Sequence, residues 1–157
     1  MMPQLNFPDY DFRIAQTQGR DEIFDPVRRK MVALTPEEWV RQHTLQYLSV
    51  DLGYPLSLIA VEGGLTLNEL KRRFDLLVYN TNGEPMLLVE CKAPGVKITQ
   101  AVFDQAARYN MAFKVGLLFV TNGMEHFCCQ IDHATAEISF LQSIPQYDKP
   151  ILQSPPL

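Results

Sequence analysis

The dipeptide Asn82-Gly83, which stands between two apolar runs, constrains this chain more than any other feature of its sequence. Asn-Gly is the strongest short-range signal for a β-hairpin, and a two-residue type I′ turn there fixes which residues of the two strands face each other. We expect these strands at 73–79 and 86–92. In that register Asp75 lies directly opposite Glu90, with Cβ atoms about 5 Å apart.

The two faces of this predicted hairpin differ sharply in chemistry. Lys92 is two residues beyond Glu90 and therefore leaves the strand on the same face. The other face is almost entirely hydrocarbon and is expected to be core; it consists of Phe74, Leu76, Val78, Leu87, Val89 and Cys91.

Two facing carboxylates destabilise a hairpin, and apolar surroundings strengthen their repulsion. Three arrangements relieve it: one carboxyl group takes up a proton, Lys92 neutralises one of them, or a divalent cation binds between them. Oxygen ligands with open positions suit Mg²⁺ or Mn²⁺. The simpler interpretation is an exposed hairpin in which Asp75, Glu90 and Lys92 form a surface salt bridge.

The rest of the chain predicts an α/β fold with a mixed sheet. Thr35-Pro36-Glu37-Glu38 is a strong helix start, with Thr35 as the cap and Glu38 completing a capping box, and the helix is expected to end near Asp51. A second helix is expected over 99–113. Further strands are expected at 58–61, where Gly63-Gly64 ends the strand, and at 115–121, 127–131 and 137–141.

Three segments are expected along the chain: an N-terminal arm or hairpin over 1–31, a main domain over 32–142, and a Pro-rich, loosely packed tail over 143–157. The 157 residues are enough for one domain that needs no disulfides. Three cysteines, two of them adjacent, fit reduced thiols and a cytoplasmic location.

Composition excludes several classes of protein. With 46% hydrophobic and 20% charged residues the chain is not disordered. A net charge of −4 excludes a generally basic nucleic-acid coat protein, so that any contact with DNA depends on local patches. No apolar run approaches the roughly 20 residues that span a membrane.

Asp75 and the tripeptide Glu90-Cys91-Lys92, with a helix next, resemble the motif of the PD-(D/E)XK nuclease superfamily. Phe74 stands where the name of that motif has proline. A longer set of segments, from about Ile23 to Leu141, resembles the N-terminal nuclease domain of type I restriction enzyme R subunits. These segments are 35–42, 73–75, 89–94, 103–109 and 120–123.

This resemblance implies a restriction-endonuclease-like mixed β-sheet flanked by helices and a Mg²⁺- or Mn²⁺-dependent endonuclease that acts on DNA. Asp75, Glu90 and the Cys91 carbonyl would hold the metal, and Lys92 would orient or activate the attacking water. In the exonuclease-like branch of the superfamily a Gln and a Tyr at the spacing of Gln105 and Tyr109 lie beside the metal and contact the substrate.

Two further assignments follow from the same comparison and from position in the chain. Glu38 is the candidate for the accessory acid of the first helix, with Glu62 as its rival. Arg72 and Arg73 lead into Asp75 and are the expected contacts to DNA phosphates.

The sequence does not decide which partners this chain has or whether it is active alone. R subunits carry a helicase motor after this domain, whereas this sequence has no Gly-rich phosphate-binding loop and therefore no expected ATP motor. Other restriction-system subunits are candidate partners. The alternative function is a non-catalytic DNA- or protein-binding module that keeps the nuclease fold. The preferred DNA and the oligomeric state are not predicted.

Overall fold

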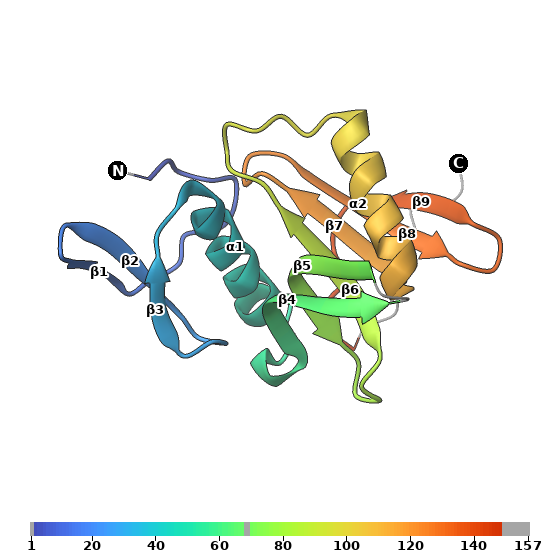
Figure 1. Ribbon diagram of the computed structural model, residues 1–157, viewed down its shortest axis with the longest axis horizontal. Helices are drawn as coiled ribbons and strands as arrows, with labels where there is room; N and C mark the ends of the chain where they lie inside the picture. Colours follow the sequence, from blue (N-terminus) through green and yellow to red (C-terminus); the bar gives the residue numbers. More distant parts are fainter. Residues whose placement is uncertain (1, 68–69, 149–157) are drawn as a thin grey trace.

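The main sheet has six strands in the order β4-β5-β6-β7-β8-β9 (Figure 1). The computed structural model describes residues 2–67 and 70–148, without the side chains of 63–67, 70–72, 109, 110 and 112. Neighbouring strands are antiparallel except β6 and β7, which are parallel and joined by helix α2. The strands are β4 Ile59–Leu67, β5 Leu70–Tyr79, β6 Pro85–Cys91, β7 Leu117–Thr121, β8 His126–Asp132 and β9 Glu137–Leu141.

The β5–β6 hairpin has the predicted register but not the predicted turn. Leu76 pairs with Val89 and Val78 with Leu87, as expected, and continuing this register sets Asp75 opposite Glu90. The two-residue type I′ turn is wrong, because Asn80 donates to Glu84 (2.8 Å) and accepts from Gly83 (3.0 Å), which leaves a three-residue loop. A β-bulge between Val78 and Tyr79 absorbs the extra residue, so the register beyond it is unchanged.

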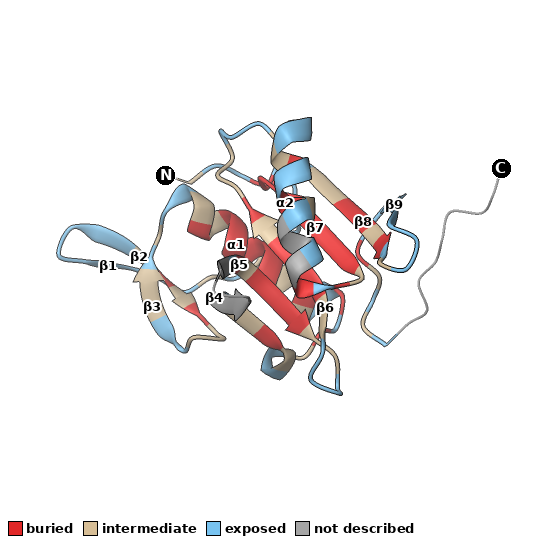
Figure 2. Ribbon diagram, turned by 45° about the vertical axis from the view of Figure 1, so that its right-hand side comes forward, coloured by how far each residue is buried: buried red, intermediate tan, exposed pale blue. Residues whose placement is uncertain are grey.

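Two helices cover opposite faces of the sheet (Figures 1 and 2). Helix α1, Pro36–Gln46, continues as a π-helical turn over Tyr47–Asp51, so the predicted end is confirmed. Its Val40, Leu45 and Leu48 side chains pack on one face of the sheet. Helix α2, Gln100–Phe113, packs on the other face through Phe103, Ala106 and Phe113.

Because both faces are covered, the hairpin is a central element rather than an exposed ribbon. Leu77 and Leu88 lie in the core beneath α2, on the face expected to carry the charged residues. The predicted hydrocarbon face is confirmed as core beneath α1 for Leu76, Val78, Leu87, Val89 and Cys91. Phe74 is the exception, because it packs with Leu77 and Leu88 beneath α2. The simple exposed-hairpin interpretation is therefore wrong for these strands.

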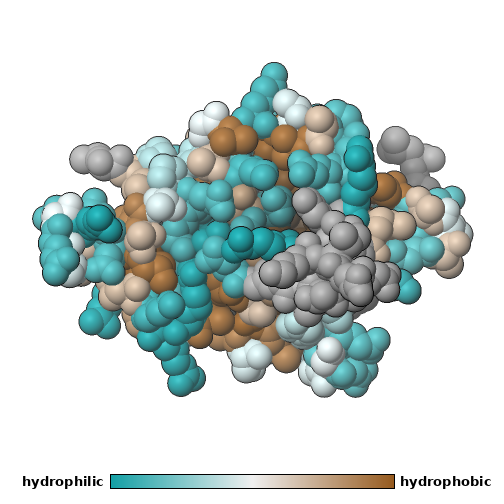
Figure 3. All heavy atoms as spheres, in the orientation of Figure 1, coloured by the Kyte–Doolittle hydropathy of each residue, from teal (hydrophilic) through white to brown (hydrophobic). Residues whose placement is uncertain are grey.

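The N-terminal segment forms a separate three-stranded antiparallel sheet, in which β1 Ile14–Thr17, β2 Arg20–Asp25 and β3 Lys30–Ala33 are in chain order. The β1–β2 hairpin projects from the left of the molecule in Figure 1, and its tip is hydrophilic in Figure 3. The preceding segment packs against α1 and β8: Leu5 is buried, and Asn6 donates to the Gly123 carbonyl (2.8 Å).

Three local predictions need correction. Strand β4 continues through Gly63-Gly64, because these residues pair with β5. Thr35 caps α1 as predicted, accepting from Glu38 N (3.0 Å), but the Glu38 carboxylate contacts other side chains and does not complete the capping box. The start of the tail is packed, since Ile144 is buried and Tyr54 donates to the Pro145 carbonyl (2.7 Å).

Residues 149–157, which include the remaining prolines of the predicted tail, lie outside the described part of the chain. Across the described residues, every helix is too short or too polar to cross a bilayer. The three cysteines are free and buried.

Candidate active site

A cavity of about 520 Å³ opens between α1, α2 and strands β4, β5 and β6. Five residues predicted for a catalytic role or for metal or DNA binding line it together: Arg73, Asp75, Glu90, Lys92 and Gln105. Its other lining residues are Glu37, Arg41, Glu62 and Phe74. Hydrophilic side chains gather across the middle of the face of the molecule that contains α1 and these strands (Figure 3).

The Asp75 carboxylate is held at both oxygens. Its Oδ2 accepts a hydrogen bond from the Cys91 backbone N–H (2.6 Å), and its Oδ1 accepts one from Arg41 Nη2 (3.1 Å). The first bond follows from the strand register, since Cys91 is next to the position opposite Asp75. The second comes from helix α1, so two different elements fix the orientation of this side chain.

Glu90 is paired with the lysine of the predicted motif. Lys92 Nζ lies 3.2 Å from Glu90 Oε1, and both side chains are partly buried. Burial, and secondarily the charge of Asp75, raises the pKa of Glu90. Burial alone would lower the pKa of Lys92, but the attraction of Glu90 outweighs it and the pKa is raised. Lys92 is therefore a firmly charged ammonium group in this cavity.

Glu37 and Arg41 are site residues that the sequence interpretation missed. They lie one helical turn apart at the start of α1, and Arg41 Nη2 donates to Glu37 Oε1 (3.1 Å) as well as to Asp75. Burial, followed by the charge of Asp75, raises the pKa of Glu37. The i, i+4 spacing of an acid and a base was the available signal. The apolar stripe of the helix gave no reason to place that pair in the site.

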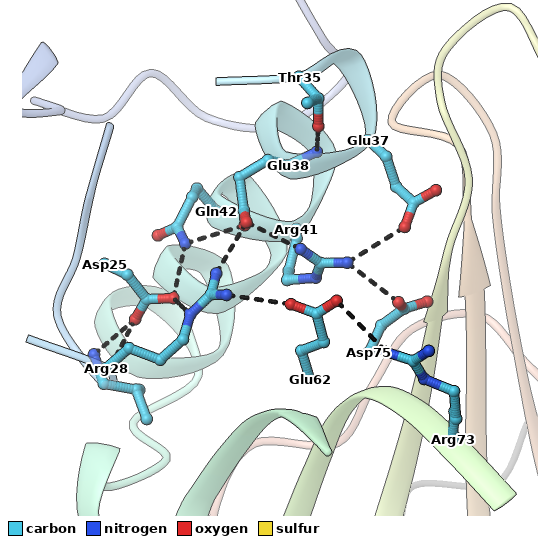
Figure 4. A network of polar contacts seen from close by, with 11 residues as sticks. Asp25, Arg28, Thr35, Glu37, Glu38, Arg41, Gln42, Glu62, Arg73 and Asp75 are labelled. Carbon is cyan, nitrogen blue, oxygen red and sulfur yellow. Dashed lines mark hydrogen bonds and ion pairs between the residues drawn. The ribbon is translucent and has the colours of Figure 1, made fainter. Parts of the chain in front are cut away.

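Glu38 is not among the residues that line the cavity with Asp75. It is buried and accepts from Arg28 Nη2 (2.7 Å), Arg41 Nη1 (2.8 Å) and Gln42 Nε2 (3.2 Å) (Figure 4). Its rival Glu62 does line the cavity and stands beside Asp75, where the β4–β5 ladder is interrupted. Glu62 accepts from Arg28 Nη1 (3.1 Å).

Two of the four residues predicted to contact DNA, Arg73 and Gln105, have side chains in the described part of the structure. Arg73 is 81% exposed, lines the cavity and lies 3.8 Å from Glu62. Gln105 is exposed on α2 and lines the same cavity. The side chains of Arg72 and Tyr109 lie outside the described part of the structure. Arg28, from the other basic run, is engaged internally by Asp25, Glu38 and Glu62.

The donor chemistry of the cavity fits a hard divalent cation. Its carboxylates come from Asp75, Glu90, Glu37 and Glu62, and oxygen ligands are those that Mg²⁺ and Mn²⁺ prefer. Within the described residues, however, no three His, Cys, Asp or Glu side chains form a ready-made metal cluster. Arg41 and Lys92 are instead ion-paired with Asp75 and Glu90.

Fold and comparisons together define the class of protein. A mixed α/β domain carries an acidic and basic cavity at the β5–β6 hairpin, and residues 36–145 match the family described as type I restriction enzyme R protein N terminus. This match covers more than half of the chain, which therefore belongs to that family. A search of curated proteins gave no match.

A solved structure shares the fold. It is described as a fragment of a putative HsdR subunit of a type I restriction enzyme from Vibrio vulnificus YJ016, and it aligns at 20% sequence identity with a TM-score of 0.52. The alignment covers 72% of this chain and 24% of that chain, so this chain spans about a quarter of the length of that protein fragment. The predicted fold class is confirmed.

Proposed function

We propose that this chain is a divalent-metal-dependent DNA endonuclease domain of the restriction type. One observation carries the proposal: Asp75 and Glu90, on neighbouring strands, and Lys92 converge on one cavity in a member of the R-protein family. The match to the PD-(D/E)XK motif is part of this proposal. The three buried thiols fit the cytoplasmic location that we propose.

Asp75, Glu90 and the Cys91 carbonyl would hold the metal. A divalent cation there would act as a Lewis acid on the scissile phosphate and lower the pKa of water. Glu37 supports this site better than Glu38, because Glu37 lines the cavity with Asp75 whereas Glu38 is engaged by Arg28 and Gln42.

The protein's own side chains would supply the remaining chemistry. Lys92 places a fixed positive charge where negative charge develops on the phosphate, an interaction that strengthens in the transition state. Its ammonium group also donates hydrogen bonds that orient the attacking water. Gln105 and Arg73 border the cavity from two sides and would bind the DNA backbone beside the cleaved bond.

Plasmid nicking in Mg²⁺ or Mn²⁺ tests the proposal. The purified protein should nick supercoiled DNA slowly and without sequence preference, and Lys92→Ala should fold normally and lose this activity. Lys30→Ala is the matched control, because Lys30 is an exposed lysine on β3 that does not line the cavity. Equal nicking by Lys92→Ala and wild type would rule out the proposed role of this lysine.

One feature favours the second candidate, a non-catalytic binding module. Asp75 and Glu90 are each neutralised by a cation of the chain itself, so the cavity is held together by its own side chains. Protein that binds metal and DNA but never cleaves any DNA form would support this module, or a nuclease that needs further restriction subunits. Addition of such subunits separates these two outcomes.

A further inference from the structure

Arg41 is a buried arginine that faces three carboxylates at once. Its side chain is 6% exposed, Nη1 donates to Glu38 (2.8 Å), and Nη2 donates to both Glu37 and Asp75 (3.1 Å each). The guanidinium therefore bridges an acid of helix α1 and the acid of strand β5 on the wall of the candidate active site (Figure 4).

On the side facing the N-terminal sheet, a network of buried polar groups holds Arg41 in place. Glu38 is shared between Arg41 and Arg28, and Arg28 Nε donates to Asp25 (2.6 Å), which is fully buried at the end of β2. Gln42 donates to both Asp25 (3.0 Å) and Glu38 (3.2 Å). Opposite charges thus alternate from the N-terminal sheet to Asp75, and each buried charge has a partner of opposite sign.

The position of Arg41 places it in competition with any cation that binds Asp75. A positive charge a few ångströms from a bound divalent cation repels it strongly, because the surroundings are only partly solvated. Asp75 Oδ2 is already occupied by the Cys91 N–H, so the contact with Arg41 uses the other oxygen.

We propose that Arg41 is a resident counter-ion of the active site: it neutralises the Glu37–Asp75 pair without metal and lowers the affinity of the site for divalent cations. This inference rests on the metal-dependent function proposed above and adds a residue that sets its metal affinity. Removing the guanidinium has two opposite effects. The carboxylates repel each other when no metal is present, and they bind a divalent cation more tightly when one is added.

Mn²⁺ titration by calorimetry, together with thermal unfolding in the presence and absence of Mn²⁺, tests the proposal. Arg41→Gln should bind Mn²⁺ about tenfold more tightly than wild type, or better. It should also unfold at a lower temperature without metal and gain more thermal stability from Mn²⁺. A purely structural arginine would lower the unfolding temperature without changing Mn²⁺ affinity.

Two further variants keep the result interpretable. Arg28→Gln removes the arginine of the same network that does not contact Asp75, and it should lower stability while changing Mn²⁺ affinity far less. Arg41→Lys retains the charge but cannot bridge three carboxylates, so its Mn²⁺ affinity should lie between those of wild type and Arg41→Gln. If Arg41→Gln does not fold, this intermediate variant alone decides.

The proposal would be overturned if the Arg41 variants bind Mn²⁺ no more tightly than wild type. It would also be overturned if neither wild type nor any variant binds Mn²⁺. Failure of the proposed nuclease function is distinguishable from this result. Tighter Mn²⁺ binding by Arg41→Gln in a protein that never nicks DNA would support the counter-ion role and reject nuclease activity of this chain on its own. Asp75→Ala should abolish Mn²⁺ binding in either background.

Discussion

Asp25 is enclosed completely, yet it is an acid with four hydrogen bonds. Its Oδ1 accepts from the backbone N–H groups of Val27 (2.8 Å) and Arg28 (2.9 Å), and its Oδ2 accepts from Arg28 Nε (2.6 Å) and Gln42 Nε2 (3.0 Å). Burial opposes the charge, but the hydrogen bonds and the charge of Arg28 outweigh it, so the pKa of Asp25 is lowered. Every neighbouring group is a donor, which only an ionised carboxylate satisfies.

Asp25→Asn should therefore destabilise the fold by about 3 kcal/mol, because it leaves Arg28 without its partner and turns an amide N–H₂ toward other donors. The stability that Asp25 contributes is present above its unfolded pKa of about 4 and is lost as the pH falls through its lower folded pKa. The variant should accordingly lose less stability than wild type between pH 5 and pH 3.

Urea unfolding at these two pH values measures both effects. Asp104→Asn is the matched control, since Asp104 is exposed on α2, and it should leave stability nearly unchanged. An Asp25→Asn protein as stable as wild type at pH 5 would show that the buried network does not stabilise the fold.

At the scale of elements, the β5–β6 hairpin depends on the backbone of Gly83. This residue has a φ of +79°, which L-residues with a side chain adopt at a cost, and a Cβ placed there would meet no atom within 4 Å. Gly83→Ala should therefore cost about 1 kcal/mol through backbone strain alone. Gly95 is the control, because it also has open space but no positive φ, and Gly95→Ala should be neutral or slightly stabilising. Equal stabilities of the two variants, measured by urea unfolding, would contradict this account.

The same hairpin shows what a sequence can predict. Two apolar runs separated by Asn-Gly were enough to predict the two strands and the register that brings Asp75 and Glu90 together. The loop length was not predictable, because an Asn-Gly pair also suits a three-residue loop. A bulge at Tyr79 compensates for the extra loop residue, so the pairing of the strands is the same for both loop lengths.

Helix α1 shows the opposite limit. Its start follows from Thr35 and Pro36, and its end from the Gly53-Tyr54-Pro55 segment that comes after it. Its buried face is also polar, however, with Glu38, Arg41 and Gln42 among the buried residues. Their partners come from β2, β5 and the β2–β3 connection, far away in sequence. Only the tertiary fold reveals that Glu37 faces the cavity and Glu38 does not.

For the whole molecule, the charge distribution limits where DNA would bind in the function proposed above. The net charge of −4 disfavours general attraction to phosphates. Arg28 is ion-paired with three carboxylates of the same chain, whereas Arg73 is highly exposed at the edge of the cavity. Only cations that are free to approach the backbone contribute to affinity for DNA.

We therefore expect the salt dependence of DNA binding to come from the β5 arginines. Each side chain that neutralises a duplex phosphate adds about 0.9 to the slope of log affinity against log salt concentration. Replacing Arg72 and Arg73 together by Ala should flatten that slope by up to about 2, while replacing the exposed pair Arg29 and Lys30 should leave it nearly unchanged. Fluorescence anisotropy with a labelled duplex at several salt concentrations measures both slopes. Dominance of the Arg29 and Lys30 pair would place the DNA over the N-terminal sheet instead of across the cavity.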